Sequence, residues 1–327
     1  MRAIGDNMRI IWIFLSSALI LATAASAANF SSTDEAIAKA TDYLLSCQNE
    51  DGGFGADPES ASDIKDTSLA VIAFACAGKN LSDLQNGSDP AKYLIAHQRD
   101  LDNLSNVEAH TARYVVAVTS AGQNPRDING KDYVKELKSY LKPDGKAGAE
   151  NYIWDDAWIA IALAACNESG SNETRELIEH LKSIQTEKGG WAWTGGSGDV
   201  DPDTTGIVMC ALACCGEGAE TDAIAKGLQY LHSEQNADGG FSTLGSNAAT
   251  DALAILAIRA AGQDPAEWKA KSSDPLQHLM SLQKDDGAVW WKSDSEGMSF
   301  EWTANMLMAL AGGTFPPAHH HGTTTLK

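Results

Sequence analysis

The sequence predicts an all-α protein, a single α6/α6 toroid built from six helical hairpin repeats. Three observations support this fold class. A Gly-rich segment recurs along the chain, an amphipathic helical pattern precedes each copy, and an almost wholly apolar helical pattern follows each copy. We expect residues 28–315 to form this one domain, after a signal peptide at 1–27 and before a disordered tail at 316–327.

The N-terminal segment has the pattern of an export signal. Arg2 and Arg9 make it basic, residues 10–22 are apolar, and residues 25–27 are small enough for cleavage. The apolar run is short for a membrane span, so we expect cleavage, with an uncleaved anchor as the alternative. Asn-x-Ser/Thr sequons also favour a secreted or extracytoplasmic glycoprotein. They begin at Asn29, Asn80, Asn86, Asn103, Asn167 and Asn172.

Charge and cysteine content narrow the function classes. The formal net charge of -20 argues against a nucleic-acid partner, because phosphate binding needs a basic face. An even number of cysteines in an exported chain is compatible with disulfides. All six lie in apolar, Ala-rich stretches, however, which favours small buried side chains. They are Cys47, Cys76, Cys166, Cys210, Cys214 and Cys215.

The recurring segment has the form of a helix-ending turn. Its paired glycines permit positive φ where a helix stops, and the aromatic residue after them folds back onto the hairpin. The clear copies are QNEDGGF from Gln48, QTEKGGW from Gln185, QNADGGF from Gln235 and QKDDGAVWW from Gln283, and degenerate copies start at Gln98 and Leu141. Before each copy, apolar residues recur at spacings of three and four, which predicts an outer helix with one polar face.

The helix after each turn is apolar nearly all round, which predicts an inner, buried helix. Aligned on one Thr or Asp, every copy has Ala six residues later. The aligned residues are Thr67, Thr111, Asp156, Thr205, Asp251 and Thr303, and the alanines are Ala73, Ala117, Ala162, Ala211, Ala257 and Ala309. An open array would need polar terminal repeats, but the first and last inner helices are as apolar as the others. A closed ring buries both of them.

The pattern Gln-x-x-Asp-Gly-Gly-[Phe/Trp], followed by an Ala-rich helix that opens on Asp or Thr, resembles a known repeat. It is similar to the QW-type repeats of squalene cyclases and of protein prenyltransferase β subunits. The resemblance covers essentially the whole chain after the signal. It implies the α-α toroid fold of that superfamily, with each Gln satisfying backbone groups at a neighbouring helix end. The repeat is architectural, so it selects no single activity.

The starts of the inner helices are predicted to gather carboxylates and aromatic side chains around one rim of the ring. An acid there also suits a helix N-cap, and an aromatic residue also packs within a hairpin. The tryptophans nevertheless exceed what the turns require, so we expect a ligand-binding rim. Its candidate binding residues are His110, Trp154, Asp155, Asp156, Trp158, Trp290, Trp291, Glu301 and Trp302.

The segment GDVDPDTTG, residues 198–206, resembles the Asp-x-Asp-Asp-Thr-Ala motif of squalene–hopene-type cyclases. The resemblance implies Asp203 as the general acid that protonates an isoprenoid, with Asp201 as its supporting carboxylate. Thr204 stands where that family has its third Asp, which removes one of the paired carboxylates. Those cyclases commonly use two toroids, and this chain provides one.

We therefore expect a toroid that binds a hydrophobic or isoprenoid-like small molecule, or a protein partner, at the acidic-aromatic rim without catalysis. One alternative is a class II terpene cyclase that uses Asp203 as acid. A third is a secreted carbohydrate-active α6/α6 enzyme with Asp155, Asp156 and Asp203 as acid and base. We expect no cofactor, with calcium at Asp199, Asp201 and Asp203 as the alternative.

Overall fold

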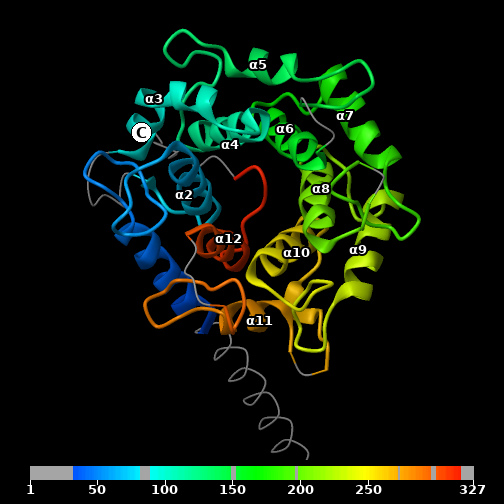
Figure 1. Cartoon of the computed structure of the whole chain (residues 1–327). Helices are drawn as coiled ribbons and strands as arrows, with labels where there is room; N and C mark the ends of the chain where they lie inside the picture. The colour runs from blue at the N-terminus through cyan, green and yellow to red at the C-terminus, as the bar shows by residue number, and fades with distance from the viewer. Residues whose placement is uncertain are drawn as a thin grey trace, which may run out of the picture.

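The computed structural model describes residues 32–81, 89–148, 152–195, 198–271, 273–295 and 300–317. Inner and outer helices alternate along the chain (Figure 1). The inner helices are α2 (Ile64–Cys76), α4 (Val107–Ser120), α6 (Ile153–Ala165), α8 (Pro202–Cys214), α10 (Ala248–Ala260) and α12 (Phe300–Leu310). The outer helices are a helix over residues 32–46, α3 (Pro90–Ala96), α5 (Tyr133–Ser139), α7 (Asn172–Ser183), α9 (Asp222–Glu234) and α11 (Pro275–Ser281). Short 3-10 helices, η2 (Gln98–Asn103) and η3 (Pro265–Glu267), lie between them.

The six hairpins close into a ring, as predicted. Each inner helix packs against the inner helices before and after it, and α12 packs against α2 (Figure 1). The outer ring is also joined across the chain ends, because Gln283 Nε2 donates to the carbonyl oxygen of Ala36 at 2.9 Å. Within the described residues the only strand-like pairings are isolated bridges, so the all-α α6/α6 toroid is confirmed.

Small side chains allow the inner helices to pack closely. The six aligned alanines are all completely buried. Gly206 shows the limiting case, because a Cβ atom there would lie 2.9 Å from the backbone of Leu253 on the next inner helix. Such contacts are possible only without a side chain, which explains a glycine in the middle of α8 despite its poor helix propensity.

Each clear turn is held from both sides. In the fourth hairpin, Gln185 Nε2 donates to the carbonyl oxygens of Gly189, at 2.6 Å, and Ala223, at 2.8 Å, in the neighbouring outer helix. From the inner side, Thr205 Oγ1 accepts the N–H of Trp191 at 3.1 Å. The corresponding acceptors in other hairpins are Thr67, Asp156, Asp251 and Thr303. The aligned Thr or Asp therefore supports the turn, and the role that the resemblance implied for Gln is confirmed.

The two glycines of the turn are required for different reasons, one for backbone conformation and the other for space. The first is needed for its backbone conformation, with φ of 91° at Gly52 and 95° at Gly239. The second is needed for space, since a Cβ atom on Gly240 would lie 2.5 Å from His278 Nδ1. The turn motif is thus explained by the fold alone.

The segment after α12 turns into the middle of the ring (Figure 1). Phe315 is 7% exposed, and its ring meets the edge of Trp158 at a centroid separation of 5.4 Å. Gly313 packs against Cys76 at the end of α2, since a Cβ atom on Gly313 would lie 2.6 Å from the Cβ atom of Cys76. Pro317 is buried. The packed segment thus extends two residues beyond the predicted domain end at 315. The remainder of the predicted tail, like the predicted signal peptide at 1–27, lies outside the described residues.

All six cysteines lie in the described part of the chain, and all are free thiols. Cys47, Cys166 and Cys210 are buried, as predicted, whereas Cys76, Cys214 and Cys215 are only partly buried. None of the described helices combines the length and the apolar character that crossing a membrane requires.

Candidate functional site

The aligned Thr or Asp of the inner helices points outward to a turn. Helix periodicity therefore places two layers of side chains toward the centre of the ring, at the N-terminal ends of these helices. Residues three apart share a helix face, so the residue before each aligned Thr or Asp lies above the residue two after it. The rim layer comprises Asp66, His110, Asp155, Thr204, Thr250 and Trp302. The lower layer comprises Leu69, Arg113, Trp158, Ile207, Leu253 and Asn305. We call the space bounded by these two layers the cup.

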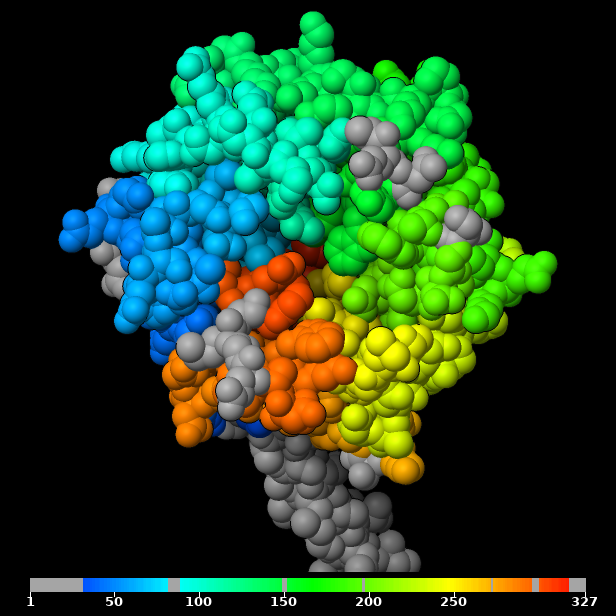
Figure 2. All heavy atoms as spheres, in the orientation of Figure 1, coloured from blue at the N-terminus to red at the C-terminus, as the bar shows by residue number. Residues whose placement is uncertain are grey.

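The lower layer is closed from below. Arg113 on α4 stacks on Trp158 of α6, with Cζ 4.9 Å from the ring centroid. Phe315 meets the same indole from the segment after α12. Figure 2 shows a hollow at the centre of the ring, with dark red atoms of the C-terminal part of the chain at its base. Among the described residues, Phe315 therefore forms part of the floor of the cup, opposite the rim.

The start of α8 joins the two sides of the rim. Asp201 is the N-cap of α8 and accepts hydrogen bonds from Thr204 N at 2.7 Å and Thr204 Oγ1 at 3.0 Å. Thr204 Oγ1 in turn accepts from Trp154 Nε1 at 3.3 Å. Thr204, in the position of the third Asp of the cyclase motif, therefore positions an aromatic ring at the rim.

Asp203 is the carboxyl of this segment best suited to proton transfer. It lies in the first turn of α8 and is half-buried. Its pKa is raised to about 6, chiefly by burial; a hydrogen bond with Thr250 opposes the rise, and the charges of Asp201 and Asp251 contribute to it. The carboxyl is therefore largely protonated in mildly acidic solution, and the charge of Asp201 favours this protonated form.

Other groups around the mouth carry less charge than their residue types suggest. Burial raises the pKa of Asp66 to about 6, with smaller contributions from Asp63 and Glu301. Burial also lowers the pKa of His110 to about 4, helped by the positive charges of Arg113 and Lys65. His110 is therefore neutral at neutral pH, where its imidazole can donate or accept a hydrogen bond.

Neighbouring Asp155 and Asp156 have different positions. Asp155 lies in the rim layer, buried against Gly148. Asp156 Oδ1 accepts the N–H of Ala147 at 2.6 Å, and its other oxygen lies 3.7 Å from His180 Nε2. Asp156 thus holds the third turn, as Thr205 holds the fourth. The prediction that Asp156 binds a ligand has no support from its position.

The tryptophans predicted to bind a ligand fall into two groups, one around the cup and one at the surface. Trp154, Trp158 and Trp302 belong to the inner helices around the cup. Trp290 and Trp291 precede α12, where Lys284 Nζ lies 3.7 Å from the Trp290 ring centroid and Lys292 Nζ lies 4.6 Å from that of Trp291. Trp291 is 43% exposed, and Glu301 is exposed as well. Trp290 and Trp291 are thus surface cation–π partners, and the structure does not place them in the cup.

The calcium hypothesis gains no support from the geometry. Among the described residues, no three His, Cys, Asp or Glu side chains come together in a way that could hold a metal ion. Both carboxylate oxygens of Asp201 are already used by Thr204, and Asp199 is exposed.

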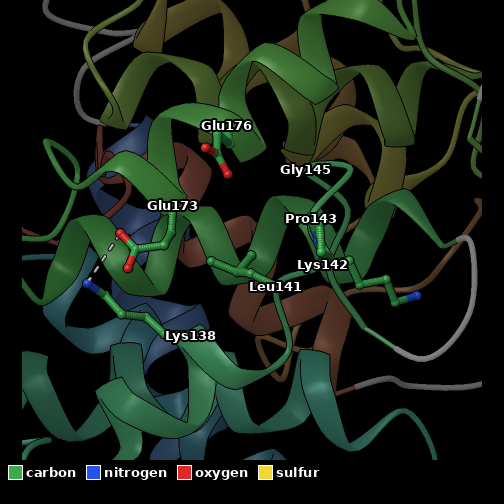
Figure 3. Close-up of a pocket in the computed structure, with 7 residues that line it drawn as sticks. All are labelled: Lys138, Leu141, Lys142, Pro143, Gly145, Glu173 and Glu176. Carbon is green, nitrogen blue, oxygen red and sulfur yellow. Dashed lines mark ion pairs between the residues drawn. The ribbon is translucent and has the colours of Figure 1, made fainter.

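A surface pocket lies outside the ring of inner helices, between α5 and α7 (Figure 3). Lys138 there forms ion pairs with Glu168 at 2.7 Å and Glu173 at 3.8 Å. These paired charges suit a solvated surface. The pocket is lined by Lys138, Leu141, Lys142, Pro143, Gly145, Glu173 and Glu176.

The residues of the cup that were missed from the sequence include Arg113 and Phe315. A signal for Arg113 was present, because it lies two residues after the aligned Thr111 and is the only Lys, Arg, Asp or Glu of α4 beyond its first turn. Its register matches that of Trp158 in α6. Phe315 gave no comparable signal, because it follows the last repeat and reaches the cup only through the fold.

The acids at the mouth should make stability depend on pH. A folded pKa raised above the unfolded value means that the folded state keeps a proton longer, so stability falls as pH rises between the two values. For Asp66 this interval runs from about 4 to about 6. Over this interval, the free energy of unfolding of Asp66→Asn should fall by roughly 1 kcal/mol less than that of the unchanged protein. Partial exposure of Asp66 keeps the difference below the full value for a buried acid. Urea unfolding of both proteins at pH 4.5 and 7.5 measures it, and parallel pH dependences would contradict it.

Comparison with known proteins agrees with this geometry. The prenyltransferase α-α toroid domain family matches residues 2–132 and 129–310. The chain belongs to this family. Drimenyl diphosphate synthase from Streptantibioticus cattleyicolor is 26% identical over 235 residues, which are 67% of this toroid chain and 43% of that protein. Uncharacterized protein CG3556 from Drosophila melanogaster is 23% identical over 314 residues, 84% of this chain and 45% of that protein. The toroid chain thus spans less than half the length of these curated relatives.

Solved structures share the toroid fold. The type II terpene cyclase MstE from Scytonema superposes with a TM-score of 0.56 and 18% identity, over 86% of this chain and 98% of that one. A variant of MstE in complex with geranylgeranyl dihydroxybenzoate superposes with a TM-score of 0.58 and 17% identity, over 86% of this chain and 97% of that one. A glycosidase variant in complex with glucose superposes with a TM-score of 0.62 and 12% identity, over 86% of this chain and 97% of that one. At these identities the likeness establishes the fold.

Proposed function

We propose that this chain is a class II terpene cyclase-like enzyme that protonates an alkene of an isoprenoid from Asp203. The observation that carries the proposal is the half-buried carboxyl of Asp203 at the mouth of the cup, with its pKa raised to about 6. A general acid must hold its proton at the working pH and be able to release it, and burial gives Asp203 that property.

The chemistry needs no cofactor and balances within the substrate. The Asp203 carboxyl gives its proton to one alkene carbon, and the other carbon becomes a tertiary cation. A second alkene attacks this cation and closes a ring. A later cation loses a proton to water, which restores a double bond, and Asp203 regains a proton from solvent. The product is therefore an isomer of the substrate. Trp154 would offer its ring face to the cations.

Two comparisons support the choice of reaction class. Drimenyl diphosphate synthase and MstE are named for terpene chemistry, and MstE is matched over nearly its whole length. The change from Asp to Thr204 leaves the general acid itself in place. Since Thr204 still connects Trp154 to the Asp201 cap, the segment keeps its local order without the third carboxyl.

The second candidate is a toroid that binds the same class of ligand without turning it over. The observation in its favour is that Thr204 replaces one carboxylate of the cyclase motif, which reduces the acidity that neighbouring groups can tune. Both candidates use the cup, and they differ only in whether a product forms.

The deciding experiment incubates the purified protein with squalene and with farnesol and geranylgeraniol, and analyses extracts by gas chromatography and mass spectrometry. We expect cyclised isomers of unchanged mass, formed faster as pH falls toward and below about 6, because Asp203 is then protonated. Ligand binding measured by calorimetry without any isomer would reject the enzyme and leave the binding protein.

A further inference from the structure

Two buried donors in the lower layer of the cup lack an acceptor. Arg113 Nε and Trp158 Nε1 are both shielded from solvent, and neither has a hydrogen-bond partner in the part of the chain that the structure describes. Native proteins satisfy nearly all buried N–H groups. Two unsatisfied donors side by side therefore mark a place where another molecule supplies the acceptor.

The two donors belong to one stacked unit that faces the cup. The guanidinium of Arg113 lies 4.9 Å from the centroid of the Trp158 ring, on adjacent inner helices α4 and α6. Trp158 is 4% exposed, and Phe315 fixes it at a centroid separation of 5.4 Å. The guanidinium is thus held in position on the indole, and its Nε–H is available for an acceptor group of the ligand.

The charges around Arg113 restrict what that acceptor can be. Burial lowers the pKa of Arg113, while Glu301 and Asp155 raise it through longer-range attraction, and no carboxylate among the described residues forms an ion pair with it. A buried cation without a close counter-ion is unfavourable, so a negatively charged ligand group would be stabilised there. Because Glu301 and Asp155 would repel a doubly charged phosphate, a single negative charge fits best.

The floor of the cup adds an apolar requirement. Phe315 and the lower-layer residues Leu69, Ile207 and Leu253 are carbon surfaces, and the last three are at most 9% exposed. A ligand whose charged end lies on Arg113 must extend an apolar chain toward the mouth, where Asp203 and Trp154 lie. An amphiphilic acid meets both conditions.

We infer that Arg113 and Trp158 bind the carboxylate of an isoprenoid carboxylic acid, whose chain runs toward the mouth. The isoprenoid nature of the chain rests on the proposed function, whereas the carboxylate rests on the two unsatisfied donors. In this orientation the far end of the chain, with its terminal alkene, approaches Asp203.

Calorimetric titration of the purified protein with farnesoic acid, farnesol and farnesyl diphosphate tests the inference. We expect farnesoic acid to bind at least about tenfold more tightly than the alcohol, and more tightly than the diphosphate. Arg113→Met should remove the preference for the acid, and Arg113→Lys should keep part of it, because lysine keeps the charge but loses the planar fork. Equal binding of acid and alcohol to the unchanged protein, or no binding of either, would overturn the inference.

Arg259 supplies the matched control. Its Nε is also buried without a partner and burial also lowers its pKa, but it lies in the last turn of α10, away from the start of the inner helices. Arg259→Met should leave the preference for the acid unchanged.

Stability gives a second measurement that separates binding from fold support. Removing an unpaired, partly buried charge should leave the melting temperature of Arg113→Met equal to or above that of the unchanged protein. A protein that fails to fold after this change would show a structural role for Arg113 and would also reject the inference. The two proposals fail separately. Arg113-dependent acid binding without cyclised product rejects only the enzyme, and cyclised polyprenols without acid preference reject only the carboxylate site.

Discussion

Replacing Asp203 with asparagine should reduce cyclisation by roughly 10²–10⁴-fold, the usual contribution of a positioned general acid. Asparagine has almost the same shape and can still form a hydrogen bond with Thr250, but it has no acidic proton to give. The measurement is the initial rate of isomer formation from the best substrate of the assay, at pH 5.5 and 7.5. Equal rates for the variant and the unchanged protein would exclude Asp203 as the acid.

The same substitution should not weaken the fold. The raised pKa of Asp203 means that its charged form is disfavoured in the folded state, so at neutral pH a neutral asparagine should unfold at the same or a higher temperature. This separates loss of chemistry from loss of structure. Ligand binding by the variant should also be kept.

Two neighbouring carboxylates serve as controls. Asp199→Asn changes an exposed acid of the same segment, and its rate should stay unchanged. Asp201→Asn removes a charge that raises the pKa of Asp203, so the activity profile should move to lower pH. Loss of activity in all three variants alike would indicate disruption of the segment rather than loss of one acid.

The fold could be predicted from sequence because its determinants are local and repeated. A turn that needs two glycines, a helix with one apolar face and a helix without a polar face each leave a pattern in short windows. Closure followed from a global argument, since Gln283 and Ala36 are too far apart in sequence for any window to join them. Closure was nevertheless predictable, because the first and last inner helices are both apolar and each needs a neighbouring helix to bury its surface.

The site was predicted less completely because it depends on which side of a buried helix faces the centre. Asp155 and Asp156 are adjacent and chemically identical, yet one lies in the rim layer and the other holds a turn. The sequence alignment did contain the role of Asp156, because Asp156 aligns with Thr205 and both side chains hold a turn. Phe315 is different, because its place on Trp158 arises from a long-range contact made after the last repeat.

Replacing Trp191 with alanine should destabilise the ring by about 3–5 kcal/mol, the usual loss for a large buried aromatic side chain. Trp191 is completely buried, and its Nε1 donates to the carbonyl oxygen of Leu181 at 2.6 Å. The substitution leaves a cavity between α7 and α8 and deprives a buried carbonyl of its partner. Urea-induced unfolding at pH 7 measures the loss.

Trp191→Phe separates the two parts of this effect, because it keeps most of the ring but loses the indole N–H. We expect a loss of about 1–2 kcal/mol, mainly from the unsatisfied carbonyl of Leu181. Trp193→Ala is the surface control, since Trp193 is 51% exposed and contributes chiefly a stack on Tyr152 at 5.2 Å. Its loss should stay below about 1 kcal/mol. If Trp191→Ala and Trp193→Ala cost the same, the turn aromatic would not be the support of the hairpin that its burial and hydrogen bond indicate.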